Sequence, residues 1–366
     1  MNVSHLHIRD VRGIKSMDLT LDDDWRGGVL DAALLVGPNG SGKTTVLNVI
    51  ASLWNVLGEF IQMESKQSNT RFQVQTSIPL NSGLAELRLN KWYGKRLYVC
   101  AGKETRIRDF VSEDPEKNGV DCVIGFGYDS QSTVGNFWFA AKGHTPVAIH
   151  TSDQIPDHVL QWIQPLSEAL LRNTLNNAKD LPNIVYFPSE NRYLNVGSYE
   201  PKPEVDAFQW LYTYAVDPVA NGGLQNYLFN LKVLDSAAFD RAVQQINNFW
   251  NGKQLDGFDQ RTRQLMVKTA NGARHPINDL SSGEKQVLLM QAHIAQRLRP
   301  EGILLIDEPD LHLHPALSMA FVNHLRTQVR EQHGQLIVAS HSPDLRQMFL
   351  GGEQIYLGEQ DEVSAF

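Results

Sequence analysis

Three carboxylates and two histidines stand close together late in the chain, in the stretch ILLIDEPDLHLHPAL (303–317). Paired acids can bind a divalent cation or act as general bases, and closely spaced histidines can bind a metal. The residue types alone therefore allow three interpretations. They are a metal site, a hydrolase that works with two carboxylates, and one part of a nucleotide-driven machine.

A second chemical motif lies near the N-terminus, where ALLVGPNGSGKTT (33–45) contains the pattern G-x-x-x-x-G-K-[ST]. An apolar run precedes the pattern and predicts a buried strand, and a helical sequence follows from about Lys43. Glycines at such a turn let backbone N–H groups converge on phosphate oxygens, and the helix directs its positive dipole end at the anion. The pattern therefore predicts an ATP-binding loop made of Gly37, Pro38, Asn39, Gly40, Ser41, Gly42, Lys43, Thr44 and Thr45.

The loop gives the carboxylates a role. Lys43 would reach the β- and γ-phosphates, and the Thr44 hydroxyl would bind Mg²⁺. The stretch GILLI (302–306) reads as another buried strand, and it delivers Asp307 and Glu308 at its carboxyl end, where open α/β sheets bind ligands. We expect Asp307 to hold Mg²⁺, directly or through water, and Glu308 to polarise the attacking water as a general base. A helix cap or a solvated turn is the alternative explanation of such a pair.

A second helix start able to bind an anion precedes this strand, in NDLSSGEKQVLLMQAHIAQRL (278–298). Ser281 and Glu284 have the spacing of a capping box, and Gly283 in the first turn leaves backbone N–H groups open. A third buried strand, QLIVASHSPDL (335–345), ends in Ser340, His341 and Ser342. His341 would lie at the same sheet edge as the acidic pair and could contact a γ-phosphate.

Together these four elements resemble the ABC-type ATPase heads of the SMC, RecF and OLD (overcoming lysogenisation defect) families. The resemblance identifies 37–44 as Walker A, 280–284 as the signature, 303–308 as Walker B and 309–315 as the D-loop, with His341 as the switch histidine. The motifs cover about a third of the chain, at its two ends. Ser282 stands where the commonest signature has its first glycine.

The resemblance implies an α/β fold, a P-loop NTPase of the ABC head type with a mixed central sheet, an antiparallel β lobe and a helical insertion. It also implies that two heads sandwich ATP and Mg²⁺. The signature of one head would then contact the γ-phosphate held by the other, and Asp310 would lie where the D-loop crosses toward the partner. On this basis Lys43, Glu308 and His341 are catalytic candidates, Thr44 and Asp307 are the metal ligands, and the trans-acting signature residues are Ser281, Ser282, Gly283 and Glu284.

The middle of the chain is expected to form an insertion, residues 61–259, between the two halves of the head, 1–60 and 260–366. The insertion is expected to contain a β-rich lobe at 70–143 and helical parts at 154–180 and 204–251. The stretches AELRLN (85–90) and TRIRDFV (105–111) alternate like strands, Pro165 is expected to break the first helical part, and an NG turn at 271–272 predicts a hairpin leading to the signature.

One departure from the family pattern lies in NIVYFPSENR (183–192), which reads as a strand returning to the core. The resemblance places a Q-loop glutamine after this strand. Only Ser189, Glu190, Asn191 and Arg192 follow it here. His312 and His314 are expected to be structural or interface residues, because no further Cys/His cluster accompanies them.

Residues 86–108 carry a formal charge of +5, with Trp92, Tyr93 and Tyr98 interleaved. Such a region could follow phosphates and stack bases, or it could be the solvated face of an antiparallel sheet. The chain as a whole has a formal charge of −8, which argues against a protein that is basic all over.

The remaining global features suggest a cytoplasmic protein. The only two cysteines, Cys100 and Cys122, fit neither a zinc pattern nor a disulfide framework. The N-terminus lacks a signal peptide, and no apolar run is long enough to span a membrane.

The resemblance suggests a slow ATPase that pairs head to head and controls a separately encoded effector. The wording of the motifs is closest to OLD-like ATPases of two-gene antiphage systems such as PARIS, Septu and some retrons, so the effector would be a TOPRIM or HNH nuclease. No nuclease cluster is visible, and too few residues follow His341 for a TOPRIM domain. The alternatives are a RecF-like repair ATPase that binds DNA and a scaffold that binds ATP with little turnover.

Overall fold

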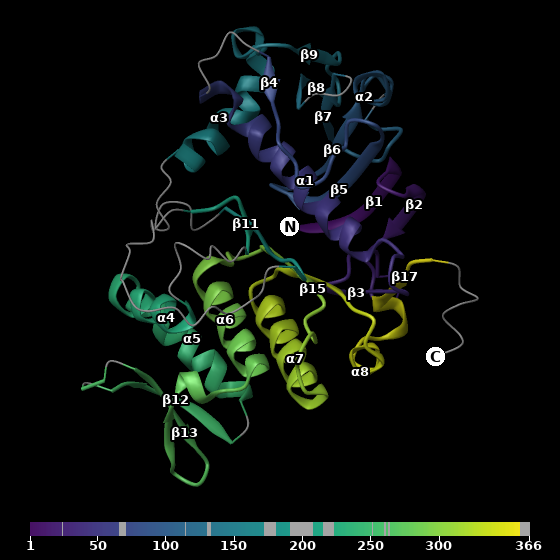
Figure 1. The fold of residues 1–366 in the computed structure, drawn as a ribbon. Helices are drawn as coiled ribbons and strands as arrows, with labels where there is room; N and C mark the ends of the chain where they lie inside the picture. The colour runs from purple at the N-terminus through teal and green to yellow at the C-terminus, as the bar shows by residue number, and fades with distance from the viewer. Residues whose placement is uncertain are drawn as a thin grey trace.

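A six-stranded sheet in the order β11-β10-β15-β16-β3-β17 carries the motifs, and all five of its strand pairings are parallel. It crosses the middle of the molecule in Figure 1. The computed structural model describes residues 1–23, 25–65, 71–113, 115–129, 133–171, 181–190, 208–214, 223–250, 252–259, 261–262 and 264–358. The strands are β3 (Ala32–Val36), β10 (Ile184–Phe187), β11 (Leu211–Thr213), β15 (Ile303–Asp307), β16 (Gln335–Ala339) and β17 (Gln354–Tyr356).

The central sheet is covered on both faces, as its apolar strands predict. Alternate side chains of one strand enter different cores: Ala33 and Leu35 of β3 face one, and Leu34 and Val36 face the other. The first core contains α1 (Lys43–Ile61). The second contains the helices α4 (Gly223–Leu234), α5 (Ser236–Phe249), α6 (Ser282–Arg297) and α7 (Pro315–Glu331). Figure 1 shows these two groups of helices on opposite sides of the sheet.

A second, eight-stranded sheet lies beyond α1, in the order β2-β1-β5-β6-β7-β8-β4 with β9 beside β8. Only its β6–β7 pairing is parallel, so the mixed pairing expected for this fold occurs here. Its strands are β1 (Asn2–Val11), β2 (Ile14–Thr20), β4 (Phe72–Gln73), β5 (Leu84–Trp92), β6 (Lys95–Lys103), β7 (Cys122–Tyr128), β8 (Val134–Ala141) and β9 (Val147–Ile149). The α/β fold class is confirmed.

Helix α1 is buried between the two sheets. In the described part of the chain it is the one helix long and apolar enough to cross a membrane, and 72% of that apolar window is buried inside the protein. Its Trp54 stacks on Trp210 with ring centroids 4.3 Å apart, and each indole N–H donates to the other residue's carbonyl at 2.8 Å. The apolar composition of α1 is therefore explained by its place in the core.

A small three-stranded antiparallel sheet precedes the signature helix α6. It consists of β12 (Lys253–Phe258), β13 (Leu265–Thr269) and β14 (Arg274–Pro276). The NG turn joins β13 to β14, with Gly272 at φ +84°, so the predicted hairpin is confirmed. The last short helix is α8 (Pro343–Arg346).

Three local predictions were wrong. Residues 105–111 form a helix, α2 (Glu104–Val111), whose Ile107 and Val111 pack on β7, where a Cβ on Gly125 would lie 2.6 Å from Ile107. Pro165 lies inside one continuous helix, α3 (Asp157–Leu171). Residues 211–213, expected to be helical, form β11, because a parallel partner, β10, is available at the sheet edge.

The expected division into head and insertion stays a prediction. Two of the expected insertion's strands, β10 and β11, pair within the central sheet, and β1 of the expected head pairs with β5 of the β-rich lobe. The parts of the helical predictions at 172–180, 204–207 and 215–222 lie outside the described residues.

One buried side chain joins the two sheets. Gln335, at the start of β16, accepts from the Val3 backbone N–H at 2.8 Å and donates to the carbonyls of Val3 and Leu30, both at 2.9 Å. The side chain is inaccessible to solvent, so water could not replace these bonds if they were lost.

We predict that Gln335→Met lowers the free energy of unfolding by about 2–4 kcal/mol, because methionine fills the space and leaves buried backbone groups unpaired. Chemical denaturation followed by circular dichroism measures this change. Gln161→Met, at an exposed position of α3, is the matched control and should change stability by less than about 0.5 kcal/mol. Equal effects of the two substitutions would contradict the role of Gln335.

Candidate functional site

The glycine-rich loop connects β3 to α1, as its sequence predicts. Gly40 and Gly42 have φ of +85° and +96°, a backbone conformation that favours glycine. The Lys43 ammonium donates to the loop carbonyls of Gly37 and Pro38 at 2.7 and 3.0 Å. The Ser41 hydroxyl is buried and has no hydrogen-bond partner among the described residues. The Lys43 ammonium thus lies against the carbonyls of its own loop, and the Ser41 hydroxyl is available as a further hydrogen-bond donor.

The carboxylate of Asp307 joins three segments that are far apart in the sequence. Its Oδ2 accepts hydrogen bonds from the hydroxyls of Thr44, at 2.7 Å, and Ser189, at 2.8 Å. Asp307 is fully buried, and its Oδ1 accepts no hydrogen bond from any described group. Thr44 is the second residue of α1, Ser189 follows β10 and Asp307 ends β15, so the three side chains meet at the carboxyl edge of the parallel sheet.

These groups fit a hard divalent cation. Mg²⁺ prefers carboxylate and hydroxyl oxygens, and a buried carboxylate oxygen without a donor needs a positive partner. Among the described residues no group of three or more His, Cys, Asp or Glu side chains could hold a metal. The candidate ligands would be the Asp307 carboxylate and the neighbouring hydroxyls, with phosphate and water completing the coordination.

The backbone leaves the extended conformation of β15 at Glu308. Its φ is +50°, which is uncommon for a residue with a side chain and costs of order 1 kcal/mol or more. Its backbone N–H donates to the Ala339 carbonyl at 2.7 Å, and its Oε2 lies 2.9 Å from Nδ1 of His341. The predicted base and the predicted switch histidine are therefore in direct contact. A carboxylate oxygen can accept a hydrogen bond from an imidazole N–H, so this contact lets His341 hold the Glu308 side chain in place.

The D-loop is tied to the strand that carries His341. The Ser340 hydroxyl donates to Oδ1 of Asp310 at 2.7 Å. His314 caps α7, because its Nδ1 accepts from the Ala316 backbone N–H at 3.3 Å. His312 has a φ of +62°, and a Cβ on Gly283 would lie 2.7 Å from its carbonyl. The D-loop thus packs against the signature of the same chain.

The signature forms the predicted capping box at the start of α6. The Ser281 N–H and hydroxyl both donate to Oε2 of Glu284, at 3.1 and 2.9 Å, and the Glu284 N–H donates to the Ser281 hydroxyl at 3.3 Å. Ser281 and Ser282 are exposed, and Gly283 is buried. Among the described residues, the side-chain hydrogen bonds of this group lead to Lys253 and not to the phosphate loop. Within one chain the signature therefore contacts the D-loop but is not hydrogen-bonded to the phosphate loop.

Two of these residues escaped the sequence reasoning. The sequence lacks the Q-loop glutamine but did not indicate that Ser189 bonds to Asp307, although a polar residue directly after a buried strand is a signal for this sheet edge. The sequence did not indicate that Lys253 contacts the signature, because Lys253 lies on a different element and only the folded hairpin brings it to Glu284.

The basic region 86–108 does not present a row of aromatic rings. Trp92 and Tyr98 are buried, and Tyr93 alone of the three is exposed, by 54%. The Arg88 guanidinium donates to the Tyr98 hydroxyl and the Asn118 carbonyl, and Arg106 pairs with Asp10 at 2.9 Å. Of the three rings that could have stacked on bases, Trp92 and Tyr98 are therefore inaccessible, while the alternative of a solvated sheet face remains open.

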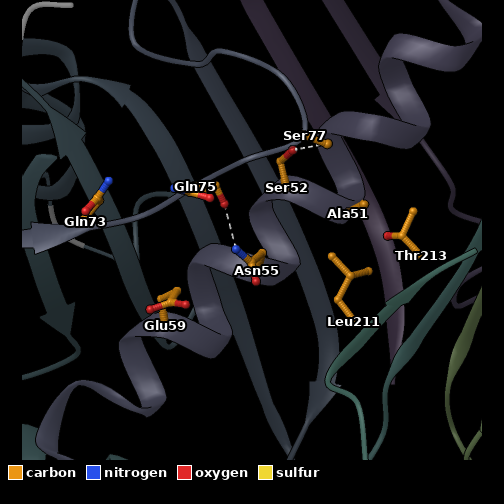
Figure 2. Close-up of a pocket in the computed structure, with 9 residues that line it drawn as sticks. All are labelled: Ala51, Ser52, Asn55, Glu59, Gln73, Gln75, Ser77, Leu211 and Thr213. Carbon is orange, nitrogen blue, oxygen red and sulfur yellow. Dashed lines mark hydrogen bonds between the residues drawn. The ribbon is translucent and has the colours of Figure 1, made fainter. Parts of the chain in front are cut away.

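A pocket of about 490 Å³ lies farther along α1, between β4 with the segment after it and the edge strand β11 (Figure 2). Its lining is largely polar: the Ser52 and Ser77 hydroxyls are 2.8 Å apart, and the Asn55 amide donates to the Gln75 carbonyl at 2.8 Å. None of its lining residues belongs to the four motifs, so it is distinct from the candidate nucleotide site.

Comparisons with known proteins find one matching family and several similar proteins. The family described as "AAA domain, putative AbiEii toxin, Type IV TA system" matches residues 175–346, slightly less than half of the chain. The Retron Vc95 probable ATPase of Vibrio cholerae serotype O1 biovar El Tor is 37% identical, over 86% of this chain and 66% of that protein. The chain thus spans slightly less than two thirds of this relative.

Two further proteins match this chain at lower sequence identity. The Septu protein PtuA of Bacillus thuringiensis is 20% identical, over 100% of this chain and 78% of that protein. The solved SMC head domain from Thermotoga maritima aligns with 95% of this chain and 92% of its own, at 12% identity and a TM-score of 0.42. The resemblance expected from the four motifs is confirmed: the chain is similar to a retron probable ATPase and to a Septu protein, and residues 175–346 match the AAA-domain family.

Proposed function

We propose that this protein binds and hydrolyses ATP between two paired heads and uses the nucleotide state to control a separate effector in antiphage defence. One observation carries the ATPase part of the proposal. The phosphate loop, the buried Asp307 and the Glu308–His341 pair lie at one edge of one sheet, where Asp307 accepts from Thr44 and Ser189 at 2.7 and 2.8 Å and Glu308 lies 2.9 Å from His341. A relative named a probable ATPase supports the same activity.

Each residue has a defined task in this reaction. Lys43 would transfer its hydrogen bonds from the loop carbonyls to the β- and γ-phosphates, and Ser41 would add a donor. Thr44 and Asp307 would hold Mg²⁺, which supplies charge neutralisation for the phosphates when bound. Glu308 would orient a water molecule and take its proton as the water attacks the γ-phosphorus, while His341 holds the Glu308 carboxylate in place.

Head pairing is supported by the position of the signature. Ser281, Gly283 and Glu284 line an open pocket of about 410 Å³, together with D-loop residues. The N-terminus of α6 is suited to an anion, yet its partners in the same chain do not include the phosphate loop. A second copy would bring its own γ-phosphate to this helix start and complete both sites by two-fold symmetry.

The effector part of the proposal rests on the relatives, one named after a retron and another after a Septu system. We propose a separately encoded nuclease, of the TOPRIM or HNH class, as the partner, and a cytoplasmic location. The basic region 86–108 does not support the DNA-repair alternative, since two of the three aromatic side chains in this region are buried.

One prediction tests Glu308 as the general base. Glu308→Gln should bind ATP but hydrolyse it at least about 100-fold more slowly, because the amide cannot accept the proton of water. The variant should therefore accumulate as an ATP-bound dimer, measured by light scattering after gel filtration and by phosphate release. Glu331→Gln, at an exposed position of α7, is the matched control and should behave like the parent protein. A parent protein without turnover and an unchanged Glu308→Gln variant would favour the scaffold alternative.

The second prediction concerns Ser189. Ser189→Ala removes a donor from Oδ2 of Asp307, so we expect about tenfold more Mg²⁺ for half-maximal binding of a fluorescent ATP analogue. Ser189→Thr keeps the hydroxyl and should restore the requirement. Ser112→Ala, at the end of α2, serves as the control. An unchanged Mg²⁺ requirement in Ser189→Ala would show that this hydroxyl has no part in the metal site.

A further inference from the structure

The signature serine is engaged within its own chain. A hydroxyl has one proton, and the Ser281 hydroxyl donates it to Oε2 of Glu284 at 2.9 Å. A γ-phosphate presents acceptor oxygens, so Ser281 can donate to it only after turning away from Glu284. The carboxylate next to this hydroxyl would also repel an approaching phosphate. Glu284 therefore opposes the binding of an anion at the start of α6, because it engages the Ser281 proton and carries the same charge as the anion.

Lys253 lies against the other oxygen of the same carboxylate. Its ammonium donates to Oε1 of Glu284 at 2.6 Å, and the two side chains are 30% and 15% exposed. Burial opposes ionisation of Glu284, but hydrogen bonds from Lys253 and Ser281 outweigh it, and the pKa of the carboxyl lies below its usual value. Glu284 is thus ionised, and its charge is balanced by Lys253.

The fold fixes the position of Lys253. It is the first residue of β12, and its ammonium lies 5.9 Å from the ring centroid of Trp250. The side chain of Asn247, in α5, holds β12 by accepting from the Leu255 N–H at 2.8 Å. The three-stranded sheet and the end of α5 therefore present this ammonium to the signature from one side.

We propose that Lys253 is a positioning residue for the paired-head reaction. It neutralises Glu284, so that the Ser281 hydroxyl and the N-terminus of α6 can receive the γ-phosphate held by a second copy of this chain. This inference rests on the proposed function, since it requires that two heads pair around ATP.

The physical effects of Lys253 act in the same direction. Without the ammonium, the unpaired carboxylate would attract the Ser281 proton more strongly, and it would repel the incoming phosphate through a partly buried environment. A glutamine at position 284 could still accept from the Ser281 N–H but would carry no charge. Lys253 should therefore be needed only while residue 284 is an acid.

The experiment uses the full chain carrying Glu308→Gln and measures the Kd of the ATP-bound dimer. Adding Lys253→Met should raise this Kd at least about tenfold at low salt, and the effect should shrink at 0.5 M salt because the repulsion is screened. Lys253→Arg should restore the parent value. In the presence of Glu284→Gln, Lys253→Met should change the Kd by less than about twofold.

Arg274→Met is the matched control, because Arg274 pairs with Asp256 at 2.6 Å in the same three-stranded sheet and away from the signature. It should leave the dimer unchanged. An unaffected Lys253→Met dimer, or a Glu284→Gln/Lys253→Met protein as weak as Lys253→Met alone, would overturn the inference. If the Glu308→Gln parent forms no ATP-dependent dimer, the proposed pairing itself is refuted, and the inference falls with it.

Discussion

The burial of the Asp307 carboxylate is the constraint on which the rest of the site depends. An ionised carboxylate removed from water is costly unless hydrogen bonds or a cation compensate for it. In this chain two hydroxyls compensate one oxygen and none of the described groups compensates the other. A bound cation would compensate this second oxygen, as the hydroxyls of Thr44 and Ser189 compensate the first.

The fold meets this constraint by ending several parallel strands at one edge. β3 leads into the phosphate loop, β10 delivers Ser189, β15 delivers Asp307 and β16 is followed by His341. The eight-stranded sheet contributes no motif residue. It packs against α1, and Gln335 joins it to the central sheet, so it supports the helix that carries Thr44.

The sequence predicted the parts of the molecule in which local pattern and tertiary context agree. Strands buried on both faces, such as β15 and β16, have continuous apolar runs, and the capping box at Ser281 is a local motif. The apolar pattern gave a wrong prediction where one spacing fits both the strand period and the helix period. In TRIRDFV the apolar Ile107 and Val111 are four residues apart, which satisfies both an alternating strand and a helix face, and the glycine-lined surface of β7 selects the helix.

The contacts that give the site its charge balance could not be predicted, because they join elements whose relative position only the fold determines. Lys253 and Glu284 belong to different elements, and Ser189 and Asp307 to strands separated by more than 100 residues. The same holds for the link between the two halves of the site. Asp310 is bonded to Ser340 beside the switch histidine, while the carbonyl of His312, two residues later, lies against Gly283 in the signature.

This link has a physical consequence for signalling between nucleotide and signature. Close-packed contacts transmit displacement, because neighbouring atoms have no free space to absorb it. The backbone of Gly283 is so close to the His312 carbonyl that even a methyl group would not fit. The turn that begins at the strained Glu308 contacts the signature through the carbonyl of His312 and is therefore a short mechanical connection. In the proposed pair of heads, a rearrangement of Glu308 that shifts this turn would also displace the start of α6, which would face the second copy.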